Sequence, residues 1–299
     1  MEFRSIFIAN PAQLFVRRGQ LVIRQEGEIS VPMEDISALL LESRAVSITA
    51  AALQELTEHG ATVYLCDGTH MPAAVTLPLN RHSRQLKQLH GQIAMSRPAQ
   101  KRIWQSVVIA KIANQARCLA LLERQGCEEL RYLSTQVRSG DPDNLEAVAA
   151  ARYFPALFGA GFTRGEDCRI NAALNYGYAI LRGAVARNLV MRGLEPCLGI
   201  FHHSELNQFN LADDLMEPYR PLIDLYVASH VPDDEDALTP AIKQNLFHLT
   251  NYLVEQNGKQ FRAITAIGRM ADSFSRMVQG AEGSMELPVL LPLQPYRYE

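Results

Sequence analysis

The spacing of hydrophobic and polar positions changes character near residue 80 of this 299-residue chain. Before that point, short apolar runs rich in β-branched and aromatic residues alternate with turn residues, which is typical of β-strands. The predicted strands span residues 5–8, 14–16, 21–24, 28–31, 36–41, 61–66 and 74–76. Arg18 and Gly19 predict a tight hairpin, and residues 49–59 predict a short helix that stops at Gly60. We therefore expect residues 1–76 to form a small, mostly β domain.

From residue 84 onward, apolar residues recur at i, i+3 and i+4, which is the period of an amphipathic helix. Helices are predicted near residues 84–95, 98–124, 127–137, 143–157, 167–192, 211–229, 238–255 and 259–279. Residues 77–83, LPLNRHS, have the composition of a linker. Residues 286–299 are too rich in proline for a helix and are expected to lie extended. The expected architecture is α+β and multidomain, with an all-α domain over residues 84–285.

Composition and charge narrow the function classes. The chain is globular, since 47% of its residues are hydrophobic and its net charge is only −3. Six arginines and two acids lie between residues 152 and 192, whereas nine acids and one arginine lie between residues 205 and 236. A basic segment beside an acidic one suits a phosphodiester held by arginines near a cation, although solvated surface faces give the same pattern.

Several other classes find no support in the sequence. The five cysteines form no CxxC pair, which disfavours a zinc knuckle and a disulfide framework. No GxSxG or Walker A sequence occurs, so serine-nucleophile and NTPase chemistry are not indicated. The first residues do not resemble a secretory signal, and no apolar run approaches the ~18 residues of a membrane span. We expect a soluble, intracellular protein with reduced thiols.

The most informative segment is residues 199–221, in which two histidines precede three carboxylates. Asp213, Asp214 and Glu217 share one predicted helical turn, so three like charges lie close together. A divalent cation, a set of arginines or bulk water could offset them. Carboxylate oxygens with one imidazole, from His202 or His203, suit Mg²⁺ or Mn²⁺ better than a thiolate zinc site.

Glu146 stands near the start of a predicted alanine-rich helix, EAVAAARYFPALF. Taken alone, such a glutamate is most often an ordinary surface residue. The small alanines around it allow a second helix or a ligand to approach the backbone closely. A glutamate at position 146 could therefore reach a shared site.

Three segments together resemble the CRISPR adaptation integrase family, the larger of the two universal spacer-acquisition proteins, and its type II subtype in particular. They are EAVAAARYF, INAALNYGYAILRGAVARNLVMRGLEPCLGIFHH and NQFNLADDLMEPYRPLID. The resemblance covers essentially the whole chain and implies a β domain followed by an α-helical catalytic domain. It also implies that Glu146, His202 and Glu217 are catalytic residues and ligands of Mg²⁺ or Mn²⁺. Many relatives have aspartate at the position of Glu217, and Asp214 is a further candidate ligand.

The resemblance implies a metal-dependent DNA endonuclease and integrase of the prokaryotic cytoplasm that inserts captured foreign DNA into a CRISPR array. Its expected partners are double-stranded and branched DNA, a second copy of the chain, and a small ferredoxin-like adaptation protein with which two homodimers form a heterohexamer. No membrane is expected to take part. The residues expected to contact DNA are Arg152, Arg164, Arg187 and His203.

Two readings from other classes stay open at this point. In one, the protein is a DNA-binding scaffold with a vestigial site, which binds DNA without divalent ions and transfers no strand. In the other, the same ligands serve a small-molecule metalloenzyme, which has no salt-dependent affinity for DNA. Incubation with branched DNA, with and without Mn²⁺, distinguishes all three readings.

Overall fold

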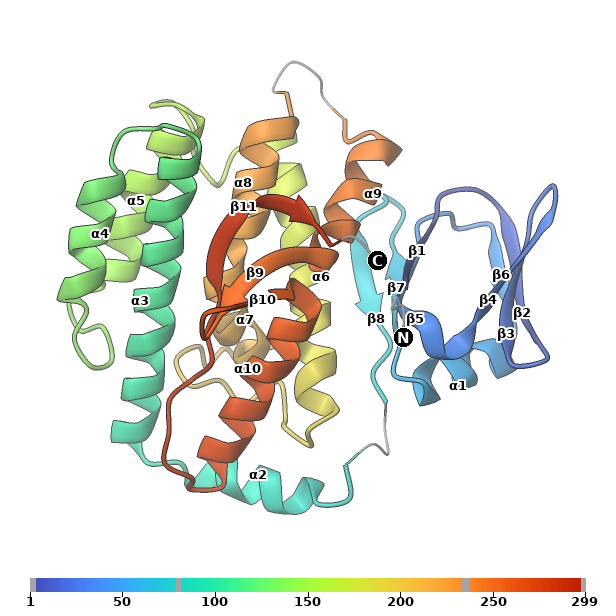
Figure 1. Ribbon diagram of the computed structural model, residues 1–299, viewed down its shortest axis with the longest axis horizontal. Coiled ribbons are helices and arrows are strands. Elements are labelled where there is room, and N and C mark those ends of the chain that lie inside the picture. Colours follow the sequence, from blue (N-terminus) through green and yellow to red (C-terminus); the bar gives the residue numbers. More distant parts are fainter. Residues whose placement is uncertain (1–3, 79–81, 233–236, 297–299) are drawn as a thin grey trace.

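The computed structural model describes residues 4–78, 82–232 and 237–296. A β-rich part lies to the right in Figure 1, and helices fill the left and centre. This order confirms the expected β domain followed by a helical domain. The middle of the predicted linker, residues 79–81, falls outside the described residues. None of the helices in the described ranges is both long and apolar enough to cross a bilayer.

Two four-stranded sheets build the N-terminal part, and one apolar core joins them. The first has the order β1-β5-β7-β8 and the second the order β4-β3-β2-β6. Their strands are β1 (Arg4–Ile8), β2 (Ala12–Arg17), β3 (Gln20–Arg24), β4 (Glu28–Pro32), β5 (Ile36–Leu41), β6 (Val46–Ile48), β7 (Thr62–Cys66) and β8 (Pro72–Val75). The predicted hairpin is confirmed, because Arg18 and Gly19 both have positive φ between antiparallel β2 and β3. The predicted helix is α1 (Ala50–Glu58), which Thr49 caps.

The C-terminal part is mainly helical, as the apolar periodicity predicts. Its helices are α2 (Gln85–Ala94), α3 (Arg97–Leu121), α4 (Cys127–Gln136), α5 (Leu145–Phe158), α6 (Arg169–Val190), α7 (Asn210–Met216), α8 (Arg220–His230), α9 (Pro240–His248) and α10 (Ala263–Val278). Short 3-10 turns occupy Glu217–Tyr219 and Leu249–Asn251, and a similar turn, Met33–Asp35, lies in the N-terminal part. One large core connects these helices.

A third sheet within the helical part corrects the expectation that this part is all-α. The helix predicted over residues 238–255 ends at His248, and β9 (Tyr252–Gln256) and β10 (Lys259–Arg262) form a hairpin before α10. The described part of the tail, residues 286–296, is extended, as expected, but β11 (Val289–Pro295) pairs with β9 and buries Leu290. Pairing between β9 and a strand more than thirty residues later gives these segments partners that a local apolar pattern cannot reveal.

Helix α6 runs through the centre of the molecule and joins the two parts (Figure 1). Gly177 and Gly183 allow this, because a Cβ atom would overlap Ile223 of α8 at the first position and Tyr64 of β7 at the second. The Tyr64 hydroxyl also donates to the Ile180 carbonyl at 2.9 Å. The close packing fixes α6 and α8 against each other, and α8 follows directly on the segment that carries Glu217.

Candidate functional site

Glu146 lies in the first turn of α5, and a neighbouring aspartate fixes that turn. Asp141 accepts the backbone N–H of Leu145 at 2.9 Å through Oδ1 and that of Glu146 at 3.0 Å through Oδ2. The helix predicted near residues 143–157 is confirmed, and Asp141 caps its first turn. Asp143 instead forms a two-pronged ion pair with Arg138. The backbone of Glu146 is therefore held before any ligand binds.

Glu217 occupies the short 3-10 turn between α7 and α8 and is buried. Its Oε2 contacts the Lys111 Nζ at 2.5 Å, and its Oε1 contacts the Arg220 Nε at 3.0 Å. Burial raises the pKa of Glu217, but the charges of Arg220 and Lys111 outweigh burial and leave the pKa below its ordinary value. Glu217 is thus an ionised carboxylate in the interior.

Lys111, in the middle of α3, links the two glutamates. Its ammonium contacts Glu146 Oε1 as well as Glu217, so both carboxylates converge on one nitrogen. Burial lowers the pKa of Lys111, but the charges of Glu217 and Glu146 together raise it by more, so the pKa lies above its ordinary value. The sequence reasoning missed this residue. A lone lysine within the apolar run VVIAKIANQA was the available signal, because a buried lysine needs a carboxylate partner.

His202 is held beside this pair by Asp214. The Nδ1 of His202 lies 2.6 Å from Asp214 Oδ1, and its side chain is 44% exposed. The hydrogen bond to Asp214 raises the pKa of His202 most, burial lowers it, and the charges of Asp214, Glu217 and Glu146 raise it further. Because Nδ1 donates to the carboxylate, Nε2 is the ring nitrogen left to bind a ligand, and a histidine oriented by a carboxylate in this way is typical of metal-binding histidines.

Asp214 is completely buried, and both of its oxygens have donors. Its Oδ2 accepts the backbone N–H groups of Ile200 and Phe201 at 2.7 and 2.9 Å, and its Oδ1 accepts that of His202 at 3.2 Å. This geometry favours an orienting role for Asp214 over direct contact with a metal. Its proposed role as a further ligand stays a prediction.

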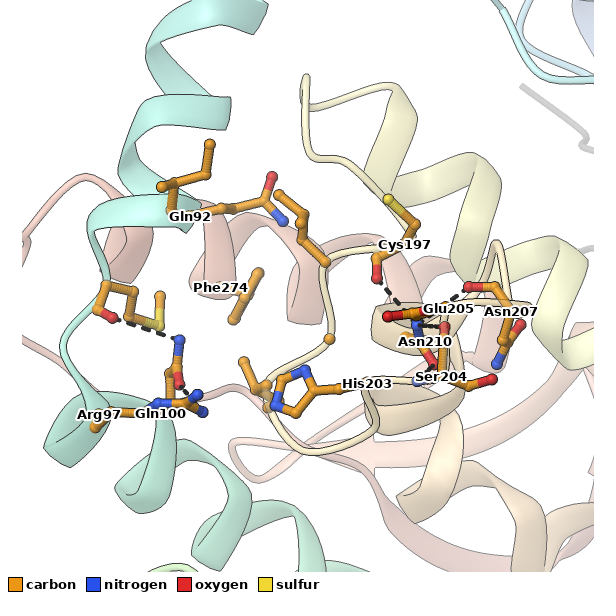
Figure 2. A pocket seen from close by; sticks show the side chains of 15 residues that line it. Gln92, Arg97, Gln100, Cys197, His203, Ser204, Glu205, Asn207, Asn210 and Phe274 are labelled. Carbon is orange, nitrogen blue, oxygen red and sulfur yellow. Dashed lines mark hydrogen bonds between the residues drawn. The ribbon is translucent and has the colours of Figure 1, made fainter.

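The loop that carries His202 is shaped by Asn210, the first residue of α7. The Asn210 amide donates to the carbonyls of Cys197, Ser204 and Asn207, as the dashed lines in Figure 2 show. Gly199 is required at the turn, because a Cβ atom there would overlap the His202 carbonyl. The same loop and the start of α3 line a cavity of about 550 Å³.

The three acids of residues 213–217 turn out to have three different partners. Asp213 forms a bidentate ion pair with Arg182 of α6, at 2.7 and 3.1 Å. Asp214 binds the loop, and Glu217 binds Lys111 and Arg220. Of the three ways to offset the like charges, the structure therefore shows basic side chains and backbone amides.

The residues expected to contact DNA lie in dissimilar places. Arg152 on α5 pairs with Glu129, and Arg164 bonds Asn171 and Asn175. Arg187 donates to the Gly60 carbonyl and so bridges α6 to the end of α1. His203 is exposed and lines the cavity in Figure 2. Their roles in DNA binding stay predictions.

The next question is whether the described side chains form a metal-binding group. Over residues 4–78, 82–232 and 237–296, no three His, Cys, Asp or Glu side chains gather as a metal-binding group. The donor set nevertheless suits a hard cation, because Glu146 and Glu217 already hold a positive charge between them in the Lys111 ammonium. Glu217 Oε2 meets the Lys111 ammonium at 2.5 Å without the alignment of a hydrogen bond, so an ion pair holds this oxygen.

Comparison with known proteins gives a consistent result. Residues 6–237 match the protein family described as CRISPR associated protein Cas1. A curated relative, the CRISPR-associated endonuclease Cas1 of Neisseria meningitidis serogroup C (strain 8013), is 45% identical, and the alignment covers 100% of both chains.

Two solved structures have the same fold. A casposase bound to integration product has a TM-score of 0.78 at 19% identity, covering 96% of this chain and 93% of that one. A chain of a Cas6-RT-Cas1–Cas2 complex has a TM-score of 0.67 at 18% identity, covering 94% of this chain and 35% of that one. These likenesses confirm the architecture of both parts of the molecule.

Proposed function

The chain belongs to the CRISPR associated protein Cas1 family, and from this we propose that it is a metal-dependent DNA endonuclease and integrase. It inserts captured foreign DNA into a CRISPR array by transesterification. The name of the 45% identical relative supports nuclease activity, and the casposase bound to integration product supports strand joining on this fold. The observation that carries the proposal is the convergence of Glu146 and Glu217 on one cation beside an oriented His202.

Glu146, His202 and Glu217 are the proposed ligands of Mg²⁺ or Mn²⁺. When bound, the ion supplies a positive charge that stabilises the developing phosphoryl charge and lowers the pKa of the attacking hydroxyl. The residues themselves prepare the site. Asp141 fixes the start of α5, Asp214 orients the imidazole, and Arg220 keeps Glu217 ionised.

In the proposed reaction, a DNA 3′-hydroxyl attacks a phosphodiester of the CRISPR repeat, one P–O bond forms and the bond to the leaving oxygen breaks. Water in place of the hydroxyl gives hydrolysis, which is the nuclease activity. Lys111 lies between the carboxylates and can stabilise negative charge on the phosphoryl oxygens or move aside when a divalent ion binds.

The proposed partners follow from the family. Arg152, Arg164 and Arg187, with His203, are proposed to hold the strands of double-stranded and branched DNA, a binding that weakens as salt rises. The chain is proposed to form a homodimer, and two homodimers to flank a dimer of a small ferredoxin-like partner. The Cas6-RT-Cas1–Cas2 complex supports assembly with a Cas2 protein.

The decisive experiment compares two adjacent histidines in a joining assay on branched DNA with Mn²⁺. His202→Ala should reduce joining on the order of 10³-fold while assembly is unchanged, because the orienting bond to Asp214 and the Nε2 donor are both lost. His203→Ala, the matched control, keeps metal-dependent joining and loses only DNA affinity. Glu146→Gln should behave like His202→Ala, since the amide keeps the volume and loses the charge.

Each rival function has its own outcome in the same assay. DNA binding that ignores Mn²⁺ and yields no joined product, even with the parent protein, supports the scaffold. Metal binding without salt-dependent DNA affinity supports the small-molecule enzyme. Full Mn²⁺-dependent joining by His202→Ala removes His202 from the mechanism.

A further inference from the structure

A rigid aromatic ring, exposed on one side, stands next to His202. The ring of Phe201 stacks on that of Trp104, with centroids 4.2 Å apart and planes 4° from parallel. His202 meets both rings edge-on, at 5.9 Å from Trp104 and 5.2 Å from Phe201. Trp104 is 1% exposed, whereas Phe201 is 43% exposed. The stack therefore has one buried side and one that opens to solvent.

Two contacts fix the position of this ring. Asp214 accepts the backbone N–H of Phe201 at 2.9 Å, and the same carboxylate orients His202. Trp104 belongs to α3, the helix that also carries Lys111. The Phe201 ring, the imidazole and the Lys111 ammonium are thus fixed to one another through a single helix and a single buried acid.

Packing alone does not account for Phe201. The loop is already held by Asp214 and by the bonds of Asn210, so the ring is not required to close it. A phenylalanine with nearly half of its surface in water leaves an apolar face uncovered, and here that face lies beside the candidate ligand His202. The face is flat and uncharged, and its other side rests on the Trp104 ring, which keeps it from turning inward.

We propose that Phe201 is a stacking platform for an unpaired nucleobase of the DNA substrate, next to the phosphodiester that reacts. The inference rests on the proposed function, because contact with His202 is what places DNA at this ring. Every base has a π-face, so a stacked ring binds without regard to sequence. The platform would hold a splayed base at a branch or single-stranded end and so place the adjacent phosphate beside His202.

The test replaces the ring and removes the base in the same experiment. Phe201→Ala should weaken binding of branched DNA with one unpaired nucleotide at the junction by about tenfold. On the same DNA with an abasic site at that nucleotide, the parent and Phe201→Ala should bind equally. A 2-aminopurine at the unpaired position should lose fluorescence on binding to the parent protein and keep it with the variant.

Two further variants separate stacking from loop structure. Phe201→Leu still covers Trp104 with apolar atoms but offers no π-face, so it should behave like Phe201→Ala. Phe201→Tyr keeps the π-face and should bind like the parent protein. Tyr132→Ala on α4, which removes another exposed aromatic ring, is the matched control and should leave binding unchanged.

The outcomes distinguish this inference from the proposed function. If Phe201→Ala costs the same affinity on abasic DNA, or if Phe201→Leu binds like the parent, the platform is refuted although joining continues. If the parent protein joins no DNA with Mn²⁺, the proposed function fails and the platform with it. Unchanged DNA binding by Phe201→Ala together with loss of assembly with a protein partner would show that the ring is a protein contact and would overturn the proposal.

Discussion

Glu217 and Asp224 are two buried carboxylates on neighbouring turns of the chain, and their surroundings are opposite. Glu217 contacts Lys111 and Arg220, which hold its pKa below the ordinary value against the effect of burial. Asp224 accepts the Tyr153 hydroxyl at 3.0 Å and the Tyr178 hydroxyl. Burial raises the pKa of Asp224 to about 6, with the hydroxyls and Arg220 acting in the other direction.

The two carboxylates thus differ in the kind of group that compensates their burial. Around Glu217 the compensating groups are the charges of Lys111 and Arg220, and the proposed function requires that a divalent cation take the place of the Lys111 ammonium. Around Asp224 the partners are neutral hydroxyls from α5 and α6, which tie three helices together. Burial of a carboxylate therefore does not distinguish the two acids, whereas the charge of the groups that contact it does.

Replacement of Glu217 and of Asp224 by their amides should give the largest difference in activity between the two positions. Glu217→Gln should reduce Mn²⁺-dependent DNA joining on the order of 10³-fold, because the ligand charge is lost. Asp224→Asn keeps a polar group between the two tyrosines, and joining should stay within about threefold of the parent protein. Single-turnover joining on branched DNA measures both. Tight Mn²⁺ binding by Glu217→Gln would show that Glu217 is not a ligand.

Removing the ammonium should expose the repulsion between the two glutamates. Lys111→Met leaves Glu146 and Glu217 facing each other, and we expect the free energy of unfolding to fall by about 3 kcal/mol without divalent ions. Added Mn²⁺ should restore most of the loss, because an ion that binds only the folded state stabilises it. Urea denaturation with and without Mn²⁺ measures this.

Lys101→Met on the exposed start of the same helix is the control for the lysine substitution. It should change the free energy of unfolding by less than about 0.5 kcal/mol, and Mn²⁺ should act on it as on the parent protein. If Mn²⁺ fails to recover the stability of Lys111→Met, the position between the glutamates does not accept a divalent ion.

Asp214→Asn addresses a carboxylate that acts through another residue. The weaker acceptor should hold the His202 imidazole less firmly, and joining should fall about 10- to 100-fold. Asp213→Asn is the neighbouring control, because Asp213 binds Arg182 and Asn207 whereas Asp214 binds the His202 imidazole, and its joining rate should stay within about threefold. Equal losses in the two variants would mean that Asp214 only maintains the fold.

The fold was largely predictable because its signals are local. The strands of the N-terminal part alternate within a few residues, and α6 shows its small residues in sequence. The sheet of β9, β10 and β11 was missed, because it depends on pairing between distant segments. An apolar run such as that of β9 is compatible with helix or strand until its partner is known.

The site was predictable in part for the same reason. His202, Asp214 and Glu217 fall in one short segment, so their proximity follows from the sequence. Lys111 comes from α3, thirty-five residues before Glu146, and no spacing rule connects the two. The distinct partners of Asp213, Asp214 and Glu217 were also out of reach, because they depend on how α3, α6 and the loop pack around α7.

The smallest expected effect concerns the pH dependence of stability at Asp224. Its pKa in the folded protein is about 6, above the ordinary 3.8, so the folded state binds a proton more readily than the unfolded chain. Stability should therefore rise as pH falls through 6, by about 1 kcal/mol between pH 7 and pH 5. Asp224→Asn cannot take up this proton, and the difference in unfolding free energy between parent and variant isolates the effect. A difference that stays constant from pH 7 to pH 5 would mean that Asp224 is ionised in the folded protein, and that the two buried acids are alike in charge after all.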